Sequence, residues 1–185
     1  MPKSNAEITD VVRNGMEKLC EDVTAQIAPL GFVRTKKVFW SRRQPLTLDF
    51  IHFHRGGISY GRPTSFQIDV RVHFGIRVLN SPPEGPALNG PCTDPRTKYG
   101  GGYKYHLGFN AQTGRLYDRC LSDILRFIGS VGEPWFARFR EVDDLLKLPD
   151  SPLSATEKLD LQAARAGKWN PSLVAASLKL FGIKE

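Results

Sequence analysis

The sequence predicts an α+β fold, in which a long N-terminal helix packs on an antiparallel sheet of about four strands and three or four helices follow. Apolar residues recur at helical spacing near both ends of the chain, whereas the middle alternates apolar and polar residues as half-buried strands do. The predicted strands also follow one another without intervening helices. That order favours antiparallel pairing over a parallel nucleotide-binding fold.

Length and composition indicate how the chain is organised. A chain of 185 residues can bury enough surface to fold without disulfides or a structural metal. We predict a single α+β domain over residues 1–150 and a C-terminal helical extension over residues 151–185 that packs on it. The oligomeric state is left open.

The same composition excludes several classes of protein. The three cysteines have unrelated spacings, so they suggest neither a disulfide framework nor a zinc knuckle. No apolar run is long enough for a signal peptide or a membrane helix. We therefore expect a cytoplasmic protein without a membrane partner or a cofactor.

The first predicted element is a helix of about six turns. Apolar residues between Ile8 and Leu30 recur every three or four positions and form a single stripe. Ser4 and Glu7 have the spacing of a capping box, and Gly31 can adopt the left-handed conformation that ends a helix.

Three strands are predicted next. Residues 32–43 and 46–54 are rich in β-branched and aromatic residues, and a polar Gln-Pro pair separates them. Residues 66–78 alternate apolar and polar side chains, so one face is buried and the other is wet. We expect the strands at 46–54 and 66–78 to pair antiparallel.

A fourth strand is predicted over residues 103–110, which alternate in the same way. A register with Ile76 opposite Tyr105 would bring the apolar residues of this strand against those of residues 66–78. Residues 80–102 lie between the two strands and contain five prolines and five glycines. We interpret them as a flexible excursion, either a tolerated insertion or a partner-binding loop.

The remaining chain is predicted to be helical. One apolar stripe runs from Leu116 to Ile128, and Pro134 opens a second helix that extends to Leu146. A capping box at Ser154 and an Asn-Pro pair at Asn170 begin two further helices. These last helices are expected to dock through Leu159, Leu173, Val174, Leu178 and Phe181.

Three segments together resemble the bacterial family catalogued as domain of unknown function 4304. They are LGFVRTKKVFWSRR, FQIDVRVHFGI and GEPWFARF, and the resemblance covers roughly residues 7–148. In that family a helix ending in Gly-Phe leads into basic, aromatic strands, and a Pro-Trp pair introduces later helices. The resemblance implies a fold and a bacterial source, but no activity, cofactor or catalytic residue.

The charge of the chain is concentrated in one segment. Residues 34–77 hold nine basic and two acidic residues, which accounts for the whole net charge of +7. Such asymmetry bears on the partners of a protein rather than on its fold, and the partner that it would suit is nucleic acid or an acidic protein. The candidate polyanion-binding residues are Arg34, Lys36, Trp40, Arg42, Arg55, Arg71 and Arg77.

These basic residues are expected to share a surface. The expected convergence is of Arg42, Arg71 and Arg77 with at least two of Arg34, Lys36 and Arg55. The alternative is that the charges form a solvated face that protects an edge strand from aggregation.

Histidines provide a weaker candidate site. In the register described above, His73 and His106 become diagonal neighbours, and with Asp69 they could bind a metal ion. The chain has no nucleophile elbow and no phosphate-binding glycine loop, so no catalytic residue is predicted.

Two functions therefore remain open. The first is a non-enzymatic binding module that engages a protein or nucleic acid through a basic sheet face or the loop at 80–102. The second is a small enzyme with a histidine-lined, metal-dependent site. Of the two, we prefer the first.

Overall fold

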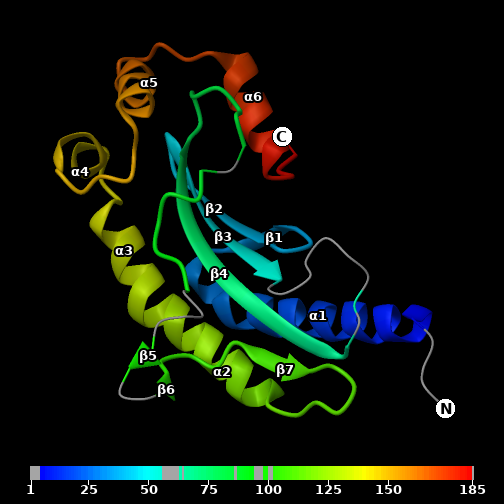
Figure 1. Ribbon diagram of the computed structural model, residues 1–185. Helices are drawn as coiled ribbons and strands as arrows, with labels where there is room; N and C mark the ends of the chain where they lie inside the picture. Colours follow the sequence, from blue (N-terminus) through cyan, green and yellow to red (C-terminus); the bar gives the residue numbers. More distant parts are fainter. Residues whose placement is uncertain are drawn as a thin grey trace.

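The predicted fold class is correct. The computed structural model describes residues 5–55, 63, 65–85, 87–93, 98–99 and 102–184, and it has an α+β architecture. A helix precedes a curled antiparallel sheet, and further helices follow the sheet (Figure 1). None of the helices in these ranges combines the length and the apolar character needed to cross a lipid bilayer.

The first helix forms where the apolar stripe predicts it. α1 spans Asn5–Ile27 and continues into a short 3-10 turn, η1, at Ala28–Leu30. Gly31 then adopts a φ of 84°, and its N–H donates to the carbonyl of Ala28, so the predicted stop is confirmed. The start of the predicted capping box, Ser4, lies outside the described residues.

The main sheet has five strands in the order β1-β2-β3-β4-β7, all paired antiparallel. The strands are β1 (Val33–Lys36), β2 (Phe39–Arg43), β3 (Thr47–Arg55), β4 (Gln67–Val78) and β7 (Gly108–Asn110). β5 (Lys98–Tyr99) and β6 (Gly102–Tyr103) pair separately. The antiparallel pairing of β3 with β4 is therefore confirmed, while the first predicted strand is in fact a hairpin of two.

The predicted register of the last strand is wrong. Ile68 of β4, rather than Ile76, is paired with this strand, and its partner is Phe109. Beyond Val70, which still donates to the carbonyl of Leu107, the edge of β4 is instead occupied by residues 87–93. The backbone N–H of Phe74 donates to the carbonyl of Pro91, and that of Thr93 donates to the carbonyl of Val72. This part of the predicted excursion therefore runs along the sheet.

Side chains hold that segment against β4. The Asn89 amide accepts from the backbone N–H of Ile76 and donates to its carbonyl, each at 3.0 Å, as a neighbouring strand would. The Trp135 ring covers Gly90 so closely that a Cβ there would lie 2.7 Å from it. Only glycine fits at this position.

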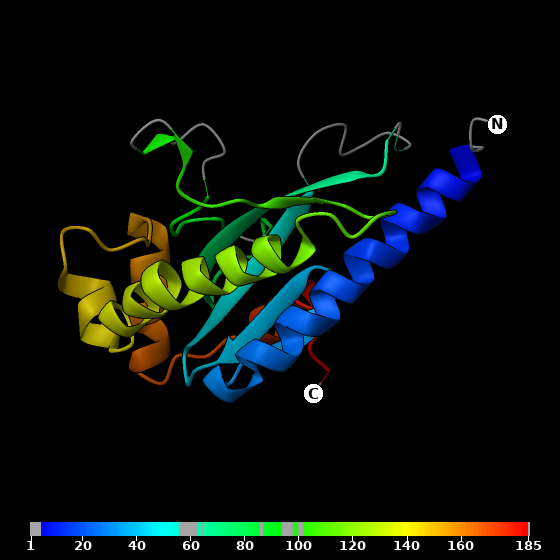
Figure 2. The same ribbon diagram turned by 90° about the horizontal axis from the view of Figure 1, so that it is seen from below.

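Helices cover one face of the sheet (Figure 2). Beside α1 lies an almost continuous rod made of α2 (Tyr117–Phe127), the π-helical turn η2 (Ile128–Gly132) and α3 (Glu133–Arg138). The predicted second helix does not continue to Leu146. The helix is interrupted by non-helical residues 139–141, and α4 (Val142–Lys147) follows. The core between these helices and the sheet includes Trp40, Phe53 and Phe74.

The C-terminal extension covers part of the opposite face. α5 (Ala155–Arg165) begins with the predicted capping box, and the Asn170 side chain caps α6 (Pro171–Leu180). Leu178 and Phe181 are buried against Leu48 and Phe50, whereas Leu173 and Val174 are half-buried. The prediction for Leu159 is wrong, since this side chain is 65% exposed and the inward face of α5 presents Leu161 and Ala164.

A polar contact ties α1 to α2. The Tyr117 hydroxyl donates to Asp22 at 2.6 Å, and the Lys18 ammonium lies over the Tyr117 ring. Hydrogen bonds from Lys18 and Tyr117 hold the pKa of Asp22 below its ordinary value. The carboxylate form therefore stabilises this contact at neutral pH.

Removing the hydroxyl tests this contact. Tyr117→Phe is expected to lower the free energy of unfolding by about 1 kcal/mol at neutral pH, measured by urea denaturation. Because the folded pKa of Asp22 is depressed, its contribution is lost as the pH falls through that pKa. The difference between the two proteins should therefore shrink in acid, and a constant difference would contradict the assignment.

Candidate functional site

The structure places two of the candidate basic-face residues on the helix-covered side of the sheet. Trp40 is fully buried, and its indole N–H donates to the Thr24 hydroxyl at 2.7 Å. Arg42 is only 8% exposed, and its guanidinium lies 4.4 Å from the centre of the Phe32 ring. Neither side chain can meet a partner without unfolding.

The Arg42 guanidinium has several partners around it. It donates to Asp49 at 3.0 Å, to Glu133 at 3.1 Å and to the carbonyl of Leu30 at 2.9 Å. Burial raises the pKa of Asp49, and the charge and hydrogen bond of Arg42 oppose that effect. Arg42 therefore joins β2, β3, η1 and α3 within the core.

The remaining candidates lie in different places. Arg77 is on the opposite face, 3% exposed, and donates to the carbonyls of Ser81 and Pro82. Arg34 forms a two-bond pair with Glu17, which lowers the pKa of Glu17. The expected convergence of Arg42, Arg71 and Arg77 is therefore wrong, because Arg42 and Arg77 are buried on opposite faces. The Arg55 side chain lies outside the described part.

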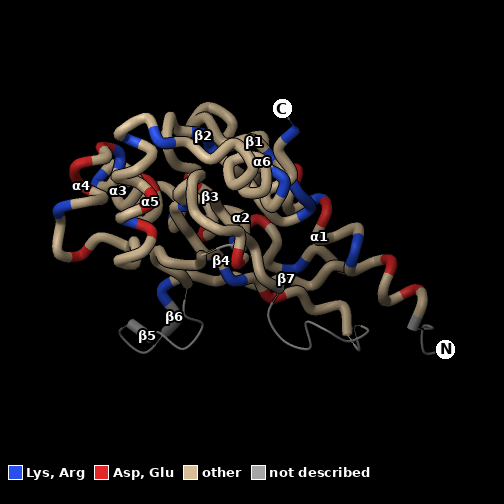
Figure 3. Tube along the Cα trace, turned by 90° about the horizontal axis from the view of Figure 1, so that it is seen from above, with Lys and Arg blue, Asp and Glu red and all other residues tan. Residues whose placement is uncertain are grey.

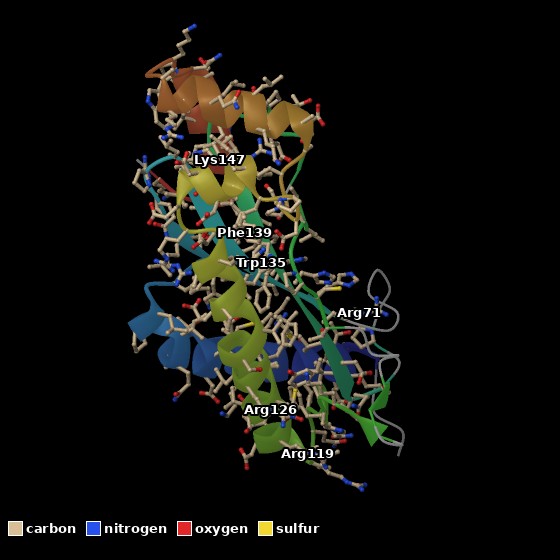
Figure 4. The ribbon with its side chains drawn as sticks, turned by 90° about the vertical axis from the view of Figure 1, so that its left-hand side faces the viewer. Arg71, Arg119, Arg126, Trp135, Phe139 and Lys147 are labelled. Atoms are coloured by element: carbon tan, nitrogen blue, oxygen red, sulfur yellow. The ribbon has the colours of Figure 1, made fainter. Side chains whose placement is uncertain are left out.

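Three exposed arginines elsewhere, Arg71, Arg119 and Arg126, do not form a shared basic surface either. Figure 4 shows Arg71 on the sheet and Arg119 and Arg126 along α2. Arg126 lies over the Tyr105 ring and donates to the carbonyl of Lys104. These arginines thus belong to separate parts of the surface.

Lysines gather where β1 and β2 meet the C-terminal segment. Lys36 packs against Gly182, where a Cβ would lie 2.9 Å from the lysine Cγ, and Lys37 follows in the turn. Gly182 donates to the carbonyl of Lys179, and Lys184 comes two residues later. Figure 3 shows basic residues gathered around β1, α6 and the C-terminus. We call Lys36, Lys37, Lys179 and Lys184 the lysine patch.

Little negative charge lies near the lysine patch, although the charge of Lys37 helps to lower the pKa of Glu17. All four residues are exposed, and none forms an ion pair with an acid in the described ranges. The nearby Glu17 is already paired with Arg34. Only Lys36 of this patch belongs to the candidates predicted from the sequence, because the tail residues lie far away along the chain.

Three histidines form a second cluster, on the sheet face that α6 only partly covers. His52 of β3 is directly opposite His73 of β4, and His54 follows two residues later on the same face. The ring centroids are 6.1 Å apart for His52 and His73, and 6.4 Å apart for each pair that includes His54. Because His52 and His54 are two residues apart, the sequence already places them on one face of a strand. The β3–β4 register was needed to place His73 beside them.

Burial keeps two of these imidazoles neutral. Burial lowers the pKa of His52 to about 4, and the neighbouring His73 and His54 act in the same direction. Burial also lowers the pKa of His73, with contributions from His54 and Arg71. The His52 ring stacks on Phe39 at 4.1 Å, and its Nδ1 is buried without a hydrogen-bond partner among the described residues.

Cys92 adjoins the same cluster. It is the antiparallel bridge partner of His73 on the side of β4 away from His52, so both side chains project from one face. Cys92 is exposed, whereas Cys20 and Cys120 are buried thiols whose pKa values burial raises to about 12. We call His52, His54, His73 and Cys92 the His–Cys cluster.

The metal site predicted from the sequence is not formed. Asp69 is paired with Gly108, so the register that would bring His106 beside His73 does not occur. The backbone N–H of His106 instead donates to the Asp123 carboxylate on α2. In the part of the chain that the structure describes, no group of three or more His, Cys, Asp or Glu side chains could hold a metal ion.

The fold defines an α+β protein with an antiparallel sheet covered by helices on one face. No protein-family model, curated protein or solved structure matches this chain at a significant level. The resemblance to the family of domain of unknown function 4304 therefore stays a prediction.

Proposed function

We propose that this protein is a non-enzymatic module that binds the phosphate backbone of nucleic acid through the lysine patch. The observation that carries the proposal is the contact of Lys36 with Gly182, which brings the β1–β2 turn beside the segment that holds Lys179 and Lys184. The four lysines are exposed, and none forms an ion pair among the described residues. Folding of the tail onto the sheet creates a positive surface that neither segment has alone.

The chemistry of lysine indicates the kind of recognition. An ammonium group is a flexible point charge that neutralises phosphate without reading base edges. Two arginines near this patch, Arg34 and Arg42, are not available for two-bond recognition because they pair with carboxylates. We therefore expect binding that depends on salt and little on sequence.

Titration of a labelled DNA duplex at two or more salt concentrations tests the proposal. Changing Lys36 and Lys37 to Gln, or Lys179 and Lys184 to Gln, is expected to weaken binding at low salt. Each double variant should also reduce the slope of log K against log salt by about 2, since each phosphate contact contributes about 0.9.

A variant with Lys158 and Lys168 changed to Gln is the matched control, because it loses the same charge from α5 and the loop after it. This control should bind like the native protein apart from a small effect of net charge. Undetectable binding of the native chain at low salt, or equal losses in control and patch variants, would contradict the proposal.

A further inference from the structure

A row of side chains connects the lysine patch to the histidines of the His–Cys cluster. Lys36 is paired with Phe39. Phe39 is in turn paired with His52, and His52 with His73. Directly paired residues of adjacent strands point to the same face, so the row lies on the face that α6 partly covers. It crosses four strands and is about 14 Å long, since adjacent strands lie about 4.8 Å apart.

Flat side chains gather at the far end of this row. His54 and His73 are half-buried, and their ring centroids are 6.4 Å apart. Arg71 is exposed and is the direct partner of His54, so it lies on the same face. His52 supports these residues from below, because its own ring is stacked on Phe39 at 4.1 Å. Imidazole rings and guanidinium planes are groups on which unpaired nucleobases stack.

The charges around the histidines fit a strand that crosses the face. Burial lowers the pKa values of His52 and His73, so these rings are neutral at physiological pH and offer a base their faces rather than a phosphate their charge. Phosphates are attracted by Lys36 at one end of the row and by Arg71 at the other. Asp69 is exposed on the same face two residues from Arg71, so we expect the path of an anionic strand to end there.

We propose that this face binds a single strand of nucleic acid, whose bases stack on His54, His73 and Arg71 while the lysine patch holds the neighbouring phosphates. This inference rests on the proposed function, because the lysine patch supplies most of the positive charge. The bases of a duplex are paired and stacked on one another, so only an unpaired strand can present their faces to a sheet. The inference therefore adds a preference for single strands to the binding of the phosphate backbone.

The test compares labelled DNA probes of equal length by fluorescence anisotropy at low salt. The probes are a single strand, a duplex, and an abasic strand that keeps the backbone but lacks the bases. We expect the full chain to bind the single strand at least about fivefold more tightly than the abasic strand, and more tightly than the duplex, since stacking of even one base has that effect. His54→Ala and Arg71→Ala should each remove most of this preference. His54→Phe keeps an aromatic ring and should retain it.

Matched variants separate this inference from the proposed function. His106→Ala and Arg119→Ala remove the same kinds of side chain beside and on α2 and should leave the preference unchanged. The lysine-patch variants should weaken binding of all the probes. Circular dichroism checks folding, and Arg71→Ala changes an exposed residue if His54→Ala fails to fold. Equal binding of the single strand and the abasic strand, or an unchanged preference in Arg71→Ala, would overturn this inference alone, whereas no binding of any probe would overturn the proposed function as well.

Discussion

Arg42→Ala is expected to lower the free energy of unfolding by about 3–5 kcal/mol, because it removes the cation from a buried ionic network. Asp49 is 5% exposed and would be left in the core without its charged partner. Glu133 and the carbonyl of Leu30 would lose their hydrogen bonds to the guanidinium in the same step. The truncation also opens space beside Phe32 and Phe136.

Chemical denaturation of the native protein and the variant measures this effect. Arg43→Ala is the matched control, since the neighbouring side chain is exposed and its loss should change stability by less than about 0.5 kcal/mol. Replacing Arg42 by Met together with Asp49 by Leu should recover part of the loss, because no unpaired charge then remains between these two positions. A loss of unfolding free energy below about 1 kcal/mol for Arg42→Ala would show that Arg42 does not hold β2, β3, η1 and α3 together.

Arg42 also shows why the basic surface was misplaced. Strand alternation correctly puts Arg42 on the same side as Trp40, since both belong to the helix-covered face. The error lay in treating that side as exposed. Asp49 is the direct partner of Arg42 across the β2–β3 hairpin, only seven positions away. Glu133 comes from a helix 91 positions away, and no local pattern reveals that pair.

Local patterns were sufficient where the structure depends on local interactions. The α1 stripe, the stop at Gly31, the caps at Ser154 and Asn170 and the β3–β4 pairing all follow from residues close in sequence or from strict alternation. The register of β7 could not be predicted in this way. Both β7 and residues 87–93 pair with the edge of β4. Asn89 and Gly90 hold the second segment there through contacts with Ile76 and Trp135.

The candidate sites required tertiary information even more. The lysine patch forms only when the tail meets the β1–β2 turn, and the His–Cys cluster only when three adjacent segments are in register. The sequence identified Lys36 and His73 as single candidates, but it joined each to the wrong partners. The net charge of a segment does not show which of its charged side chains form ion pairs in the folded protein.

Phe181→Ala is expected to lower the free energy of unfolding by about 3–5 kcal/mol and to release the C-terminal segment from the sheet. The ring is 1% exposed, lies 4.8 Å from the Phe50 ring and 6.0 Å from the Phe39 ring, and anchors the turn that carries Gly182 against Lys36. Leu159→Ala, on the exposed face of α5, is the control and should change stability by less than about 0.5 kcal/mol.

The same pair of variants links stability to the proposed function. Release of the tail would separate Lys179 and Lys184 from Lys36 and Lys37, so Phe181→Ala should weaken nucleic-acid binding at low salt although no charge has changed. Hydrogen exchange should show loss of protection confined at first to residues 171–184, under conditions in which the rest of the chain stays folded. Retained protection in that segment, or binding as strong as that of Leu159→Ala, would mean that docking of the tail does not create the lysine patch.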